Sequence, residues 1–282
     1  MNLRGNIPAA TVFVVLLAFC FALTTGCTDD EVTPYVPSEE SLAFYELKTI
    51  TANVSESFSV TLALAENTAG DLAKIDHNRT QMNTVLMDSQ ESLPWVDSAA
   101  FIDTSGVVIA IMPDSYSDLV GVDLSHQAIV QECLSNRSPV ISDYMLLEEG
   151  EMGIVLEYPV FSEGGEFAGI VSFAIDPANV IEYALDGKKP GYMYSVMAAQ
   201  PDGLILYDED PEEIGSETFG NPEYEAYPSL IEFAEAYSSS PLGTYNYSFK
   251  ATGSTEEVQK QAFWDTVEIL DKEWRVMLIK EM

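Results

Sequence analysis

The longest hydrophobic pattern in the chain has the period of a helix. Apolar residues recur at steps of three and four positions over Leu47–Leu86, and Arg79 is the one position that breaks the stripe. This spacing predicts a long helix over residues 41–93 that ends before Pro94. Such a stripe is typical of a coiled-coil dimer or of a helix packed against its own domains. The many Ala and Thr residues in it favour the second arrangement.

Between Pro139 and Asp176 the hydrophobic period changes to that of strands. The apolar runs Ile154–Phe161 and Phe167–Ile175 flank the sequence SEGGE at residues 162–166. Glycine supplies the positive φ that a tight turn requires, so the pattern predicts a β-hairpin. With the strand that precedes it, the hairpin should form a meander on one face of a sheet.

A hairpin and a helix precede this meander, and the same succession of elements follows it. The first copy has predicted strands at 99–103 and 107–112 and a helix at 127–134; the second has strands at 194–199 and 204–207, a helix at 228–237, and strands at 243–249, 261–269 and 274–279. The repetition predicts an internal duplication, with one α+β module at 94–187 and another at 188–282.

The N-terminal residues predict export. Arg4 precedes the apolar run Ala9–Leu23, which is short for a bilayer span, so residues 1–26 are expected to be a signal peptide. The sequence LTTGC, which ends at Cys27, resembles a lipobox, although Thr24 stands where an aliphatic residue is usual. A secreted protein and an uncleaved N-terminal anchor are the alternatives, and all three place the chain outside the cell.

If the lipobox is used, Cys27 carries lipid and holds the protein on the extracellular face of the cell membrane. Residues 27–40 are acidic and contain prolines, which is typical of a tether. Cys133 is then the one cysteine of the mature body, so an intrachain disulfide framework is excluded. Its place on the apolar face of a predicted helix suggests a buried small hydrophobe instead of a nucleophile.

Charge and motifs restrict the function further. The net charge of −34, with only 12 Lys and Arg residues, argues against nucleic-acid binding. His77 and His126 are the two histidines, and neither stands in a spacing that would ligate zinc. Because the chain also lacks a nucleophile elbow and a phosphate loop, we expect no enzyme activity, no cofactor and no metal.

The order and spacing of several stretches resemble the double Cache family of extracellular sensor domains. These stretches are FIDTSGVVIA, GVDLS, PVISDYML, YPVFSEGGEFAGIVSFAIDP and PDGLILYDEDPEEIG. The resemblance covers residues 40–282. It implies an α+β fold with a long N-terminal helix followed by two PAS-like antiparallel-sheet modules, and a small-molecule pocket in the membrane-distal module.

The chemistry of the side chains and, for His126, Asp143 and Tyr144, the resemblance indicate five candidate ligand-binding residues in the first module. These are Tyr116, His126, Asp143, Tyr144 and Tyr158. Tyrosine combines an apolar ring with a hydroxyl that can orient a small ligand. His126 lies at the start of the helix that borders the family's pocket, but it could equally be an exposed or capping residue. Tyr158 alternates with Leu156 and Val160, and the sequence leaves open which face of the sheet it occupies.

One position departs from the amino-acid binders of the family. They carry an Asp on the last strand of the distal module that receives the ligand's amine, and here Ala174 takes that place. They also carry an Arg and a Trp at the start of the helix, where this chain has SHQAIV. Burying an amine without an anionic partner is costly, so the resemblance does not predict an amino-acid ligand.

The sequence thus supports a lipid-anchored sensory protein that binds a small extracellular ligand. Since no second apolar segment long enough to span a bilayer is evident, it would act through a membrane receptor or a transporter. A cell-envelope scaffold or adhesion protein that uses the same fold without a ligand is the alternative.

Overall fold

The computed structural model describes residues 37–75, 78–185 and 193–282. The predicted signal peptide, Cys27, most of the tether, His77 and the boundary predicted between the modules lie outside these ranges. Residues Ser38–Met282 form one compact unit.

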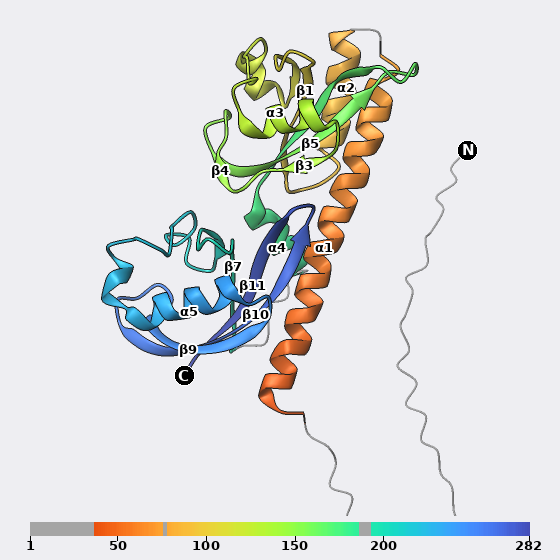
Figure 1. Cartoon of the computed structure of the whole chain (residues 1–282). Coiled ribbons are helices and arrows are strands. Elements are labelled where there is room, and N and C mark those ends of the chain that lie inside the picture. Colours follow the sequence, from red (N-terminus) through yellow and green to blue (C-terminus); the bar gives the residue numbers. More distant parts are fainter. Residues whose placement is uncertain (1–36, 76–77, 186–192) are drawn as a thin grey trace, which may run out of the picture. The chain divides into compact units, whose positions relative to one another are not determined.

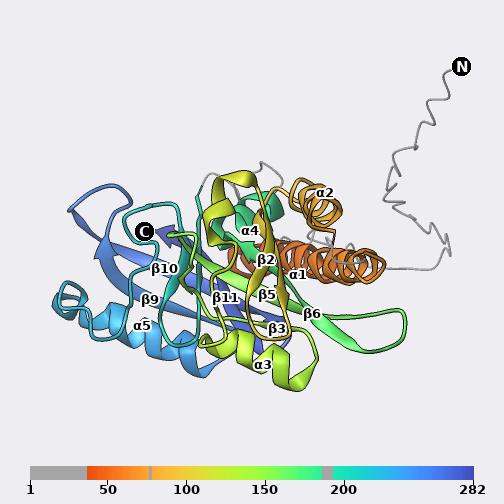
Figure 2. The same cartoon turned by 90° about the horizontal axis from the view of Figure 1, so that it is seen from above.

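The helix predicted over residues 41–93 is two helices, α1 (Glu39–Leu72) and α2 (Arg79–Gln90). The second helix starts at Asn78, whose side-chain oxygen accepts from the backbone N–H groups of the second and third residues after it, at 3.1 and 3.3 Å. The Thr68 hydroxyl near the end of α1 lies 2.8 Å from that of Ser89 near the end of α2. Figure 1 and Figure 2 both show α2 folded back beside the end of α1.

The first sheet is antiparallel and has the strand order β2-β1-β6-β5-β3, with β4 paired to β5. Its strands are β1 (Val96–Asp103), β2 (Val108–Met112), β3 (Val140–Ile141), β4 (Met145–Leu146), β5 (Met152–Phe161) and β6 (Phe167–Ile175). Helix α3 (Ala128–Asn136) and a 3-10 turn at Asp114–Leu119 follow the β1–β2 hairpin. The predicted hairpin of β5 and β6 is present, with the turn where the glycines stand.

The second sheet repeats this topology with the order β8-β7-β11-β10-β9. Its strands are β7 (Ser195–Ala199), β8 (Ile205–Asp208), β9 (Gly243–Lys250), β10 (Glu257–Ile269) and β11 (Lys272–Glu281), and its helices are the short 3-10 turn Tyr224–Ala226 and α5 (Pro228–Ser239). In both sheets the last strand pairs with the first strand of the hairpin, so the two modules are copies of one unit. The predicted α+β fold class is confirmed.

Helix α4 (Pro177–Ala184) follows β6 and was not predicted. The Asp176 carboxylate caps it by accepting from the Ala178 backbone N–H at 2.8 Å, and Pro177 occupies the first turn, where no backbone donor is missed. The Asp-Pro pair directly after the strand could therefore have predicted the start of this helix.

Helix α1 packs against one face of each sheet and joins them in a shared core. Edge-to-face ring contacts link Phe44 to Phe263 and Phe58 to Trp274, with centroids 5.6 and 5.0 Å apart. On the first sheet, Leu156 and Phe173 belong to the same buried cluster as these helix residues. The opposite face of the first sheet is covered by α3 and the loops around it, and it is this face that carries the candidate site.

The close approach of β6 to β1 gives a stability prediction. Gly169 has φ 148°, and a Cβ there would lie 2.3 Å from the Ile102 carbonyl oxygen, so Gly169→Ala must displace backbone. We expect a loss of about 2–3 kcal/mol in the free energy of unfolding, measured by urea denaturation. Gly165→Ala is the control because its φ is 81° but no atom lies within 4 Å of a new Cβ, so about 1 kcal/mol is expected. Equal losses of unfolding free energy in the two variants would show that the close approach of β6 to β1 does not determine the cost of Gly169→Ala.

Candidate functional site

A cavity of about 40 Å³ lies between the first sheet and its cover, and we call it the first-module cavity. It has room for about three waters, or for a ligand of a few non-hydrogen atoms. Its lining is Ala100, Ile102, Val108, Ile111, Leu119, Val122, Leu124, Gln127, Met145, Leu147, Glu148, Glu149, Val155, Glu157, Ser172 and Ala174. The apolar side chains come mainly from the strands and the acidic ones from β5 and the loop that precedes it.

Glu157 is the most unusual residue of this lining. Its side chain is on β5 and the residue is only 1% exposed. Oε1 accepts a hydrogen bond from the Ser172 hydroxyl on β6 at 3.1 Å, whereas Oε2 is buried and has no partner among the described residues. Burial raises the pKa of this carboxyl to about 8, and the nearby Glu149 adds to the rise. The cavity wall therefore holds a carboxyl group with one unused oxygen.

The alternation of β5 explains how a glutamate comes to face the cavity. Successive side chains of a strand point to opposite faces, so Val155 and Glu157 share the cavity face. Leu156, Tyr158 and Val160 lie on the other face and pack into the core that contains α1. A single acidic residue inside the apolar run GIVLEYPVF was the sequence signal for this site, and it was missed.

Further carboxylates surround the cavity. The Gln127 side-chain amide donates to Glu148 at 3.0 Å, and the Ser98 hydroxyl donates to Glu149 at 2.5 Å. Burial and, next to it, the charge of Asp176 together raise the pKa of Asp97 to about 6. None of the described residues that line the cavity is Lys, Arg or His. The electrostatics therefore favour a cation over an anion.

Three of the predicted ligand-binding residues lie away from the cavity lining. Tyr158 faces α1, as described above. Tyr116 is in the 3-10 turn and packs beside the apolar cluster under α3, where burial raises the pKa of its hydroxyl. His126 is exposed, and its Nδ1 lies 3.1 Å from the Asp123 carbonyl oxygen. Tyr158 therefore packs in the core beside α1, Tyr116 packs in the apolar cluster under α3, and His126 lies on an exposed loop.

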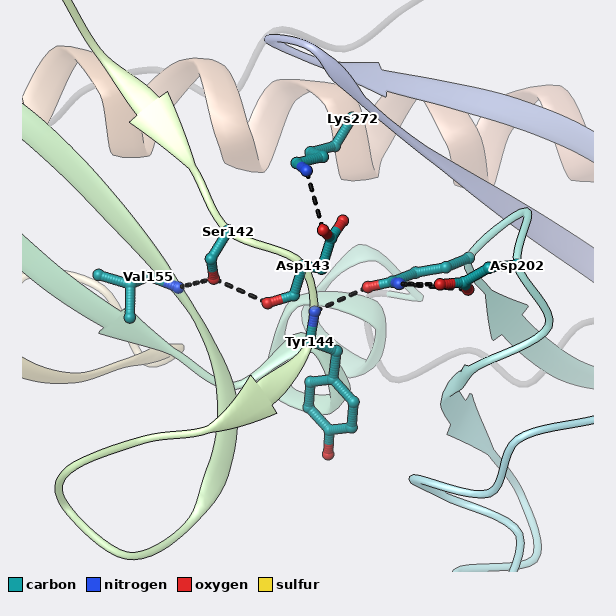
Figure 3. Close-up of polar contacts among 7 residues, drawn as sticks. Ser142, Asp143, Tyr144, Val155, Asp202 and Lys272 are labelled. Carbon is teal, nitrogen blue, oxygen red and sulfur yellow. Dashed lines mark hydrogen bonds and ion pairs between the residues drawn. The ribbon is translucent and has the colours of Figure 1, made fainter. Parts of the chain in front are cut away.

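The other two predicted residues, Asp143 and Tyr144, lie where the two modules meet (Figure 3). The Asp143 carboxylate forms a 3.0 Å ion pair with Lys272 at the start of β11. The Tyr144 backbone N–H donates to Oε1 of Gln200, in the β7–β8 turn of the second module, at 2.7 Å. Both residues therefore connect the modules and do not line the cavity.

The same segment is tied to the cavity wall. The Ser142 hydroxyl accepts from the Val155 backbone N–H at 2.9 Å and donates to the Asp143 carbonyl oxygen at 2.8 Å. Val155 lines the cavity and is two residues from Glu157. A continuous set of hydrogen bonds thus joins β5 to Gln200 of the second module, as Figure 3 shows.

Ala174 does line the cavity, as its correspondence to the family's Asp implied. Its partner across the strands is Val155, and the next pair on the same face of β5 and β6 is Glu157 with Ser172. A carboxyl group thus lies one strand away from the position where the family carries its Asp, and burial raises its pKa to about 8. A carboxyl group that can pair with an amine is therefore present in this cavity, although it is not at position 174.

Other chemistry is limited in the part of the chain that the structure describes. It holds no group of three or more His, Cys, Asp or Glu residues placed to bind a metal ion. Cys133 is buried, and burial raises the pKa of its thiol to about 12, which agrees with a packing role. No helix among the described residues is long and apolar enough to cross a bilayer.

Comparison with known proteins finds a sensor-domain family model that matches part of the chain. Residues 59–177 match the family model described as HK/GC/chemotaxis protein-like, sensor domain. No curated protein sequence matches the chain. The sequence match covers part of α1, α2 and all the strands of the first sheet, and it includes every residue that lines the first-module cavity.

Solved structures match over most of the described chain. An extracellular ligand-binding receptor from Desulfohalobium retbaense is 21% identical, with a TM-score of 0.66, over 84% of this chain but only 40% of that one. The ligand-binding domain of the Pseudomonas aeruginosa chemoreceptor PctB, in complex with L-Arg, is 16% identical, with a TM-score of 0.61, over 86% of this chain and 96% of that one. The periplasmic sensory domain of the Campylobacter jejuni chemoreceptor Tlp1 is 15% identical, with a TM-score of 0.59, over 85% and 93%. The fold is therefore that of Cache-type, PAS-like sensor domains.

Proposed function

We propose that this protein is an extracellular sensor that binds a small organic ammonium ion in the first-module cavity. The observation that carries the proposal is Glu157, a buried carboxyl whose Oε2 has no partner among the described residues and whose strand position faces the cavity. A buried unpaired carboxyl destabilises the empty protein, and an ammonium group supplies both the opposite charge and the missing donor.

The lining also restricts the rest of the ligand. Ala100, Ile102 and Val108 provide apolar walls, which suit a short alkyl group. A carboxylate on the ligand would lie among glutamates without a basic side chain in the lining. We therefore expect a simple amine to bind more tightly than the corresponding amino acid.

The solved relatives make an amine reasonable. Structures of Pseudomonas aeruginosa chemoreceptor domains contain L-Arg in PctB and GABA in PctC, and both compounds carry an amino group. In this chain Glu157 would receive that group in place of the family's Asp. Among the described residues, the lining offers no basic side chain to the carboxylate of an amino acid. The ligand proposed here is therefore an amine without a carboxylate.

A thermal-shift panel tests this proposal. Methylammonium, ethylammonium and propylammonium chlorides should raise the melting temperature of the purified protein at pH 8, and glycine and alanine should do so less. Sodium chloride at the same concentration is the control for ionic strength. If no amine raises the melting temperature while sugars, purines or other neutral compounds do, the ligand class is wrong. If nothing in a broad panel does, the protein is better described as a scaffold.

The contacts between the modules provide a route by which the second module can respond. In our proposal, ligand binding at Glu157 shifts β5, and the hydrogen bonds through Ser142 and Tyr144 carry that shift to Gln200. The output would pass to a membrane receptor or transporter. Because the route depends on single hydrogen bonds between identified residues, removing one of them tests it.

Replacing Gln200 tests the coupling. Gln200→Ala removes the acceptor of the Tyr144 N–H without touching the cavity. We expect amine affinity to change less than twofold, while ligand-induced changes in amide hydrogen exchange in β7 and β8 disappear. Lys272→Met is the comparison, because its ion pair with Asp143 is partly exposed and should contribute less. Unchanged exchange responses in Gln200→Ala would exclude this route.

Lipid attachment at Cys27 remains part of the proposal. Cys27→Ser should release the protein from the membrane fraction of cells that express the full chain. Metabolic labelling with a fatty acid should fail in the same variant. Continued membrane retention of Cys27→Ser would favour an uncleaved N-terminal anchor.

A further inference from the structure

The second module contains its own cavity, of about 50 Å³, which we call the second-module cavity. It lies between the second sheet and α5 and the loops beside that helix. The rings of Phe233 on α5 and Tyr247 on β9 stack at 4.5 Å between centroids and form part of its wall. The size and the apolar wall are similar to those of the first-module cavity, but the polar groups are different.

One hydrogen-bond donor of this lining has no partner among the described residues, and a second is held only by a long ion pair. The residue Tyr237 is fully buried, and its hydroxyl has no hydrogen-bond partner among the described residues. Lys260 on β10 has a side chain only 8% exposed, and its Nζ lies 3.7 Å from the nearest Glu281 oxygen, which is longer than a hydrogen bond. A buried ammonium and a buried phenol that share one cavity both need an acceptor.

Each carboxylate of the same lining accepts at least one hydrogen bond. Asp208 accepts from the Asp210 backbone N–H at 2.8 Å, and Asp210 accepts from the Gly253 N–H at 3.2 Å. Glu213 accepts the Tyr224 hydroxyl. The second ammonium group of the lining, that of Lys250, is paired with Glu223. The Tyr237 hydroxyl is therefore the one buried side-chain polar atom of this lining that lacks a hydrogen-bond partner among the described residues.

We propose that the second-module cavity is a separate site for a small monocarboxylate, which accepts hydrogen bonds from the Lys260 ammonium and the Tyr237 hydroxyl. The ring pair of Phe233 and Tyr247 packs against its alkyl group. Asp208 limits the affinity, because its charge opposes that of the ligand. The site is independent of the ammonium site in the first module, and a protein with both could respond to two compounds of opposite charge.

Calorimetric titration of the purified protein with sodium acetate and sodium propionate tests this site. Tyr237→Phe and Lys260→Met should each weaken binding about tenfold or more. Asp208→Asn should strengthen it several-fold, because the opposing charge is removed. Tyr237→Phe should fold as stably as the parent, since the hydroxyl it removes has no partner, so its loss of binding cannot be attributed to unfolding.

Glu157→Gln is the control that separates the two cavities, and carboxylate affinity should be unchanged in it. The proposal is overturned if neither carboxylate shows saturable binding. It is also overturned if Tyr237→Phe and Lys260→Met bind as the parent does, or if Asp208→Asn weakens binding. All of these outcomes are separate from the response of the first-module cavity to amines.

Discussion

Replacing Glu157 with glutamine should weaken the binding of ethylammonium by about a hundredfold or more. The variant keeps the size of the side chain and a group that can accept from Ser172, but it removes the charge that pairs with the ligand. Loss of one partner of a buried ion pair costs about 3–5 kcal/mol, which corresponds to this change in affinity. Calorimetric titration at pH 8 measures it directly.

Glu148→Gln is the matched control for this prediction. Glu148 also lines the cavity, but it is exposed and its carboxylate already accepts from Gln127. Its removal should weaken ethylammonium binding less than tenfold, because solvent screens an exposed charge. Similar losses in the two variants would indicate a general effect of negative charge near the cavity. An unaffected Glu157→Gln would place the amine elsewhere.

The second large effect is on the stability of the empty protein as a function of pH. The pKa of Glu157 is raised from 4.5 to about 8, so the folded protein holds a proton there that the unfolded chain has released. Its contribution to stability is therefore fully present below about pH 4.5 and is lost as pH rises towards 8. Glu157→Gln has no proton to lose, so it should be more stable than the parent by about 3–5 kcal/mol at pH 8.5 and about equal to it at pH 4.5.

Urea denaturation of both proteins at several pH values checks this. Asp97 and Asp208 also have raised pKa values, so the parent and the variant should both lose stability as pH rises. The difference between the two curves isolates Glu157. If the curves run parallel from pH 4.5 to 8.5, the carboxyl is ionised throughout in the folded state, and it is not the buried proton-binding group described above.

Most of the fold could be predicted from the sequence, because tight turns and the alternation of apolar and polar residues in strands are local features. The SEGGE turn and the apolar runs beside it define the β5–β6 hairpin, and the repeat of this order revealed the duplication. The break between α1 and α2 could not be read in the same way. Both helices bury their apolar residues in one core, so the stripe continues across the reversal, and only Arg79 and the capping Asn78 mark it.

The site was less predictable than the fold. Tyr158 was proposed on chemistry alone, and the register of β5, which only the three-dimensional pairing fixes, turned it towards α1. Asp143 and Tyr144 were expected beside the ligand but connect the two modules. Glu157 was readable in principle, because a glutamate among apolar neighbours on a buried strand needs an explanation. Attention to Ala174, the position of the family's Asp, concealed the carboxyl on the adjacent strand.

The most direct test of the central claim is the number of protons released when ethylammonium binds at pH 7. Ethylammonium keeps its charge at this pH, whereas Glu157 must lose its proton to pair with it. Calorimetry in two buffers with different ionisation enthalpies should give about one proton released per ligand, and affinity should rise with pH between 6 and 8. Saturable binding without proton release, at an affinity that does not change with pH, would contradict the assignment of Glu157 as the ligand's anionic partner.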